Sequence, residues 1–145
     1  MFDILLTSAL TILGGVLVFS LSQIVLRFLV EPIHEQAKAI GEIFFGLVYY
    51  ADRYANPGSG RTEAMTEAAD TLRRYASQLE GTTYAVRWYR LFERIGLAPS
   101  RERVNEAVGN LIRISNSIHT GNGRENSDDA DKVKELLSVP KKKKA

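Results

Sequence analysis

Residues 4–26 (ILLTSALTILGGVLVFSLSQIVL) form a stretch of the chain without one charged side chain. As an α-helix this stretch is roughly 35 Å long, and the hydrocarbon core of a bilayer is about 30 Å thick. A cleavable signal peptide has a basic start and a small-residue cleavage site, whereas this chain begins Met1-Phe2-Asp3 and continues with Arg27-Phe28-Leu29-Val30 after the stretch. We therefore expect a retained transmembrane helix within residues 1–31, the alternative being a buried helix of a soluble domain.

Basic residues flank this stretch on its C-terminal side only. No Lys or Arg precedes it, whereas Arg27, Lys38 and Arg53 follow it. Cytoplasmic flanks of membrane spans carry an excess of Lys and Arg, so we expect the N-terminus outside and the rest of the chain in the cytoplasm. The chain contains no cysteine, which agrees with a reducing compartment.

Small and hydroxyl-bearing side chains recur along one side of the expected span. At 100° per residue, five positions share a stripe about 80° wide: Ser8, Thr11, Gly15, Val18 and Ser22. Small residues let membrane helices approach closely, and hydroxyls can bond across the contact, so the stripe predicts self-association of the spans. Two alternatives stay open: the hydroxyls bond carbonyls of their own helix, or they line a narrow pore with Gln23 near its cytoplasmic end.

After the span, the spacing of apolar residues predicts an all-α domain of about four amphipathic helices. They are expected over residues 32–55, 62–80, 83–95 and 100–121. Pro32 predicts either a kink or a fresh helix start. Gly81 and Gly96 are expected to end the second and third helices, and Ser100 to cap the fourth. The third helix is expected to bury four side chains: Ala85, Trp88, Phe92 and Ile95.

The composition changes after Thr120 to Gly, Asn, Ser and Asp, residues that bury too little apolar surface to order themselves. Beyond Asp131, the side chains of Val133, Leu136 and Leu137 could form one short helix. The basic end, Lys141–Lys144, is typical of a solvated tail near anionic lipid. The predicted domains are therefore a transmembrane helix (1–31), a cytoplasmic helical bundle (32–119) and a flexible tail (120–145).

Arginines and aromatic residues are interleaved between Tyr84 and Arg94, with another arginine pair shortly before. Guanidinium groups hold phosphates through forked hydrogen bonds, and aromatic rings stack on the bases of single-stranded nucleic acid. The candidate residues for binding an oligonucleotide or another anion are Arg73, Arg74, Tyr84, Arg87, Tyr89, Arg90 and Arg94. In this hypothesis the arginines of the third helix contact phosphates, and Tyr84 or Tyr89 stacks on bases. The alternative is that the arginines pair with surface carboxylates and the aromatic rings are core.

No pattern in the sequence predicts catalysis. The only histidines, His34 and His119, are far apart, and there is no nucleophile motif. The segment 58–62 (GSGRT) superficially resembles a phosphate loop but lacks the lysine and the preceding strand. We therefore expect no enzyme activity, no metal site and no cofactor.

The overall layout resembles the membrane effectors of the Hailong anti-phage defence system. The resemblance covers roughly residues 1–118 and rests on the outward N-terminus, the hydroxyl-rich span, the segment 31–43 (EPIHEQAKAIGEI) and the small helical domain. It implies a homo-oligomeric channel of the bacterial inner membrane, a tetramer, which binds short single-stranded DNA made by a partner nucleotidyltransferase. Bound oligonucleotide would hold that channel closed. The alternatives are a membrane-tethered helical adaptor and a regulator that binds anionic lipid, both without channel activity.

The expected orientation is testable with a reporter fused after Ala145. A reporter that works only in the cytoplasm should be active, and one that works only outside should be silent, because the basic flank keeps this side inside. The opposite pattern would contradict the assignment of the helical domain to the cytoplasm.

Overall fold

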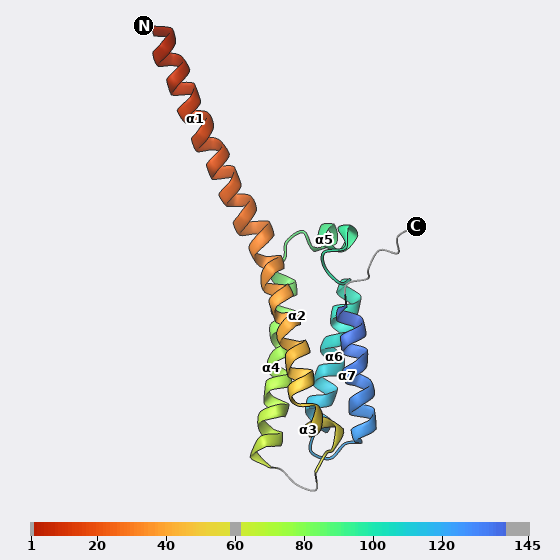
Figure 1. Ribbon diagram of the computed structural model, residues 1–145. Helices are drawn as coiled ribbons and strands as arrows, with labels where there is room; N and C mark the ends of the chain where they lie inside the picture. Colours follow the sequence, from red (N-terminus) through yellow and green to blue (C-terminus); the bar gives the residue numbers. More distant parts are fainter. Residues whose placement is uncertain (1, 59–61, 139–145) are drawn as a thin grey trace.

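The computed structural model describes residues 2–58 and 62–138, and every regular element in these two stretches is a helix. The elements are α1 (Phe2–Val25), the π-helical turn η1 (Leu26–Val30), α2 (Glu31–Tyr49), α3 (Ala51–Ala55), α4 (Glu63–Ala85), α5 (Tyr89–Ile95), α6 (Arg101–Ser117) and α7 (Gly123–Leu137). Figure 1 shows α1 extending alone from one end of a bundle formed by α2, α4, α6 and α7. The predicted all-α fold class is confirmed.

The first three elements form one unbroken helix from Phe2 to Tyr49. Its N-terminal part is long and apolar enough to cross a membrane, judged by length and composition. No residue of α1 is buried against the rest of the chain. The apolar side chains of α1 therefore remain exposed within the described part of the molecule.

Pro32 changes the helix without interrupting it. A proline inside a helix clashes with the carbonyl four residues earlier, here that of Phe28. In η1 the backbone widens, and the N–H of Glu31 donates to the carbonyl of Leu26, five residues back. Pro32 then lies in the first turn of α2, as expected for a fresh helix start, but no break precedes it because the helix is continuous from Phe2 to Tyr49. Figure 1 shows α1 leaning away from the bundle while α2 runs alongside α4.

The bundle core is made by apolar side chains that α2, α4, α6 and α7 turn toward one another. Its fully buried members include Ile43, Leu47, Leu72, Leu79, Leu111, Ile114, Ile118, Val133 and Leu137. Gly46 on α2 lets the backbone approach the ring of Tyr75 on α4, because a Cβ at this position would clash with that ring. The side chain of Ser100 caps α6 by accepting from the N–H of Arg103, as predicted.

The helix predicted over residues 83–95 is wrong. Helix α4 continues through Gly81 to Ala85, because Leu79 and Thr83 are both buried on its inner face, and such packing overrides the weak helix propensity of one glycine. The chain then becomes extended at Val86 and restarts as α5, which ends at Gly96 with φ 76°, as predicted. Of the four side chains expected to be buried here only Phe92 is, whereas Ala85, Trp88 and Ile95 are exposed.

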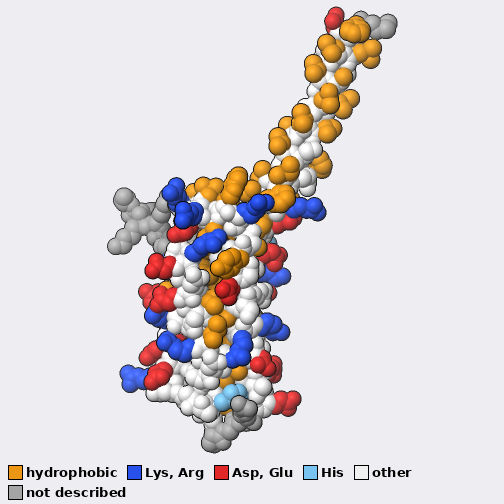
Figure 2. Space-filling model, turned by 180° about the vertical axis from the view of Figure 1, so that it is seen from behind, with side chains coloured by type: hydrophobic (Ala, Val, Ile, Leu, Met, Phe, Trp, Pro, Cys, Tyr) orange, Lys and Arg blue, Asp and Glu red, His pale blue; other side chains and the backbone are white. Residues whose placement is uncertain are grey.

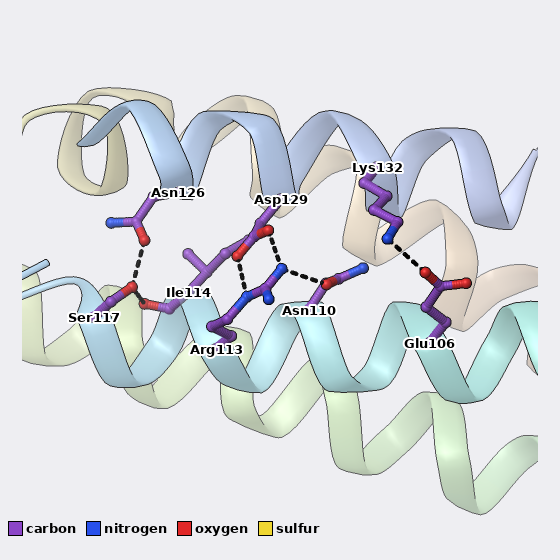
Figure 3. Close-up of polar contacts among 8 residues, drawn as sticks. All are labelled: Glu106, Asn110, Arg113, Ile114, Ser117, Asn126, Asp129 and Lys132. Atoms are coloured by element: carbon purple, nitrogen blue, oxygen red, sulfur yellow. Dashed lines mark hydrogen bonds and ion pairs between the residues drawn. The ribbon is translucent and has the colours of Figure 1, made fainter. Parts of the chain in front are cut away.

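The fourth helix of the bundle is α7, which occupies much of the segment predicted to be flexible. Figure 3 shows how its polar residues are satisfied against α6. The Oδ1 atom of Asn126 accepts from Ser117, its Nδ2 donates to the carbonyl of Tyr54 at 3.0 Å, and Arg113 pairs with Asp129. Polar groups that find buried partners do not oppose folding, so the flexibility predicted for residues 123–131 is wrong. The short helix expected around Val133 is the C-terminal half of α7.

Two sequence predictions concern residues outside the described part of the chain. The phosphate-loop-like segment 58–62 includes three such residues, 59–61, and the lysines Lys141–Lys144 fall entirely outside. The expected role of the lysines near anionic lipid therefore remains a prediction.

The docking of α7 predicts that Asn126→Ala destabilises the protein. This change leaves the carbonyl of Tyr54 without its buried donor, which costs about 1–3 kcal/mol of unfolding free energy. Denaturant unfolding of the full chain in detergent, followed by circular dichroism, measures the effect. The matched control is Arg124→Ala, an exposed residue of the same helix, which should leave the unfolding free energy nearly unchanged. Equal stability of both variants would contradict the docking.

Candidate anion-binding site

A hollow of about 430 Å³ lies between α5 and the start of α6. It is lined by Arg87, Trp88, Tyr89, Arg90, Leu91 and Arg101. Three of these side chains are cationic and none is acidic. In the described part of the chain none of these three guanidinium groups forms an ion pair. The hollow is therefore suited to an anion, and the alternative, in which its arginines pair with surface carboxylates, is not found in the described part of the chain.

Arg101 is the member of this site that sequence reasoning missed. Its guanidinium carbon lies 5.1 Å from the ring centroid of Tyr89 and 5.8 Å from that of Tyr84, both within cation–π range. Arg101 follows the helix cap Ser100, and its sequence neighbourhood gives no sign that it folds back over Tyr84. Only the turn between α5 and α6 brings the two residues together.

Tyr89 is a structural residue, contrary to its predicted role in base stacking. Its side chain is 1% exposed, and its hydroxyl donates to the carbonyl of Pro99 at 2.7 Å and accepts from Nε2 of Gln36 at 2.8 Å. The same Gln36 amide also donates to Oγ1 of Thr83 at 2.9 Å. Burial raises the pKa of the Tyr89 hydroxyl. The ring is thus held in a buried network and cannot receive a ligand base.

Two exposed rings lie beside the arginines instead. Tyr84, at the end of α4, is 71% exposed, and Trp88, just before α5, is 62% exposed. Tyr84 keeps its predicted availability for stacking. The prediction that Trp88 lies in the core is wrong. Because the helix restarts at Tyr89, the side chain of Tyr89 points inward and that of Trp88 is exposed.

Four of the predicted residues do not line the hollow: Arg73, Arg74, Tyr84 and Arg94. Arg73 and Arg74 lie on α4 about 16 Å along the helix axis from Tyr84, at 1.5 Å per residue. Arg73 donates to Oδ1 of Asn116 on α6, and Arg74 lies 6.0 Å from the ring of its neighbour Tyr75. Arg94 is exposed on α5 but does not line the hollow. Of the predicted arginines, Arg87 and Arg90 line the hollow, whereas Arg73, Arg74 and Arg94 lie outside it.

The site is attached directly to the long N-terminal helix. Val86, Tyr89, Phe92 and Ala98 form a small buried cluster, against which Leu29 of η1 and Ile33 of α2 pack. A second hollow, of about 370 Å³, separates the helix from the start of α5 and is lined by Ile24, Phe28, Leu29, Arg87 and Trp88. Figure 2 shows hydrophobic side chains gathered at this end of the bundle, beside the base of α1, with Lys and Arg side chains around them.

The residues predicted as a span interface or pore lining are all exposed on α1: Ser8, Thr11, Gly15, Ser22 and Gln23. The hydroxyls of Thr11 and Ser22 donate to the carbonyls of Thr7 and Val18, at 2.9 and 2.8 Å. This bonding within the helix is one of the predicted alternatives. A Cβ at Gly15 would meet no atom within 4 Å, so the backbone is open to close approach there.

The π-helical turn brings two exposed stripes of the long helix into line. One π turn adds a residue. Side chains beyond it are therefore rotated back by about 100° about the helix axis, compared with their positions in an unbroken α-helix. With this rotation, one exposed stripe of α2 continues the stripe of small residues on α1: Ala37, Gly41, Phe45 and Val48. The side of α2 that packs in the bundle carries Ala39 and Ile43 and faces away from this stripe.

The buried hydroxyl of Tyr89 predicts a specific dependence of stability on pH. Because burial raises its pKa, the folded protein keeps the proton at pH values where the unfolded chain has lost it. This contribution is fully present below the pKa of the unfolded chain, about 10, and is lost as pH rises through the folded value. Tyr89→Phe should cost about 1–3 kcal/mol at pH 7 and make the decline in unfolding free energy above pH 10 shallower.

Denaturant unfolding at a series of pH values measures both effects. Tyr84→Phe, which changes an exposed tyrosine, is the matched control and should follow the parent protein. A Tyr89→Phe curve parallel to that of the parent would contradict the buried network.

No protein-family model matches this chain, and neither does any curated protein or solved structure.

Proposed function

We propose that this protein is a homo-oligomeric membrane effector, an ion channel gated by a short single-stranded oligonucleotide in bacterial anti-phage defence. In this proposal α1 spans the inner membrane with its N-terminus outside, and the bundle lies in the cytoplasm. Copies associate along the stripe of small residues, and the ligand binds at the arginine-lined hollow. The ligand is supplied by a partner nucleotidyltransferase, as the resemblance to Hailong effectors implies.

The observation that carries the proposal is the position of the hollow. Its lining residues Arg87 and Tyr89 belong to the segment that packs on Leu29 and Ile33, the point where α1 continues into α2. A ligand bound there acts on the helix that leaves the membrane without any intervening flexible linker. Such direct contact is what a ligand needs to bias a helix between two arrangements.

The chemistry of the hollow supports an oligonucleotide as ligand. Arg87, Arg90 and Arg101 offer forked donors for phosphate oxygens, and the exposed ring of Tyr84 offers a face for one base. A volume of about 430 Å³ lies within the range of roughly 300–1,000 Å³ typical of small-ligand sites. Each subunit would therefore bind one part of a short oligonucleotide.

The continuous exposed stripe of the long helix supports self-association. Membrane helices pack closely where small residues leave room, and Gly15 on α1 and Gly41 on α2 both leave such room. Since the stripe continues past the π turn, two copies can contact each other from the span into the bundle. A change at the hollow is then transmitted to the neighbouring copy as well.

Ligand binding is tested with the full chain in detergent and a fluorescent oligodeoxynucleotide. Affinity should fall steeply with salt because each neutralised phosphate releases a counterion. Tyr84→Ala should lower affinity by about ten- to hundredfold, the cost of one stacking ring, and Arg101→Ala should also reduce the salt dependence. Arg74→Ala is the matched control outside the hollow. The proposal of an oligonucleotide ligand would be overturned if the parent protein did not bind, or if all three variants lost affinity equally.

Channel activity is tested by ion flux through vesicles containing the purified protein. Gly15→Leu places a branched side chain where two helices are proposed to meet, so cross-linked oligomers and ion flux should both decrease. Gly14→Leu makes the same change about 100° around the helix and should have little effect. Oligomers without ion flux would favour a membrane-tethered adaptor. If Gly15→Leu left the cross-linked oligomers and the ion flux unchanged, the stripe would not be the contact between copies.

A further inference from the structure

We infer that the edge formed by Trp88, Leu91, Ile95 and Leu97 docks on the anionic surface of the bilayer that α1 crosses. This inference rests on the proposed membrane insertion of α1 and does not depend on a channel or an oligonucleotide. We call these four residues the α5 edge.

The α5 edge is an apolar surface without a partner inside the described part of the molecule. Leu91 and Ile95 are four residues apart on the outer side of α5, opposite the buried Tyr89, and are 45% and 51% exposed. Leu97, in the turn that follows, is 61% exposed. Apolar side chains grouped in this way, next to cations, are typical of helices that lie in a membrane interface.

The depth of the α5 edge follows from the second hollow. A hydrocarbon core of about 30 Å takes up roughly 20 helical residues, so a core entered near Ile4 is left near Ile24. The ring of Trp88 lines the same hollow as Ile24 and Phe28. Trp88 is therefore level with the boundary between hydrocarbon and headgroups, the depth at which tryptophan is enriched in membrane proteins.

The charge of the segment selects an anionic surface. Residues 86–101 contain four arginines and one glutamate, a formal charge of +3. Arg94 lies beside Ile95 on α5, is exposed and takes no part in the hollow, and Arg27 in η1 is near the same depth. Long basic side chains at this level reach the headgroups while their methylene groups cover apolar surface, and anionic headgroups attract them.

The single tryptophan of the chain makes the inference directly measurable, because Trp88 is the only source of tryptophan fluorescence. The full-length protein is reconstituted without oligonucleotide in vesicles of phosphatidylcholine alone or mixed with phosphatidylglycerol. Docking predicts a blue-shifted emission, protection from acrylamide and quenching by lipids brominated near the headgroup, all stronger in the mixed vesicles. Alkaline carbonate extraction is measured in parallel to establish insertion of α1.

Substitutions separate the α5 edge from the rest of the surface. Ile95→Asp should abolish the quenching by brominated lipid and restore access of acrylamide, and Arg94→Ala should weaken the preference for anionic vesicles. Ile112→Asp, which puts the same charge on an exposed apolar position of α6, should change neither measurement. Resistance of all variants to carbonate extraction shows that the span itself is unaffected.

Four results would overturn the inference. Release of the parent protein by carbonate would refute both the membrane span and the docking. If the protein stays inserted but acrylamide reaches Trp88, the docking alone is refuted. Equal quenching in neutral and anionic vesicles removes the selection by charge. Protection of Trp88 in detergent, without quenching by brominated lipid in vesicles, assigns the α5 edge to a contact between protein chains.

Discussion

The arrangement of this protein depends on one buried hydrogen-bond network around Gln36. Its amide donates to both Thr83 and Tyr89, and the hydroxyl of Tyr89 donates to the carbonyl of Pro99. These bonds join α2, the end of α4, the start of α5 and the turn before α6. Buried polar groups cost free energy when they lose their partners, so the network fixes where α5 sits. The arginine-lined hollow and the exposed α5 edge both follow from that position.

The long N-terminal helix is distorted at one point, between its exposed part α1 and its packed part α2. In α2 one side is buried against α4, whereas α1 has no buried residue. The π turn η1 lies between them, and its cause is the ring of Pro32, which a regular helix cannot accommodate without strain. The turn also sets the rotation of α1 relative to the bundle. The direction of the exposed stripe on α1 is thus decided by a proline outside the apolar stretch.

The errors of sequence reasoning have two physical causes. Polar residues such as Asn126 and Asp129 were assigned to a flexible tail, because in a sequence a polar side chain bonded in an interface is indistinguishable from one bonded to water. The second cause is the break in the helix, which changes which residues face inward. A helix running unbroken from residue 83 would bury Trp88, but the chain is extended at Val86. The new helix then buries Tyr89 instead. Of the predicted site residues, Arg87 and Arg90 line the hollow together with Arg101, and Tyr89 is held in the buried hydrogen-bond network.

The sequence by itself determined the features that depend on neighbouring residues. These are the uncharged stretch of residues 4–26, the all-helical fold class, the cap at Ser100 and the stop at Gly96. Only the tertiary structure decided which helix completes the bundle, which aromatic ring is buried and which arginine joins the hollow. Each of these depends on partners far apart in the chain, such as Gln36 with Tyr89 or Asn126 with Tyr54. Local spacing sets the elements, and their burial against one another selects the residues that face the arginine-lined hollow.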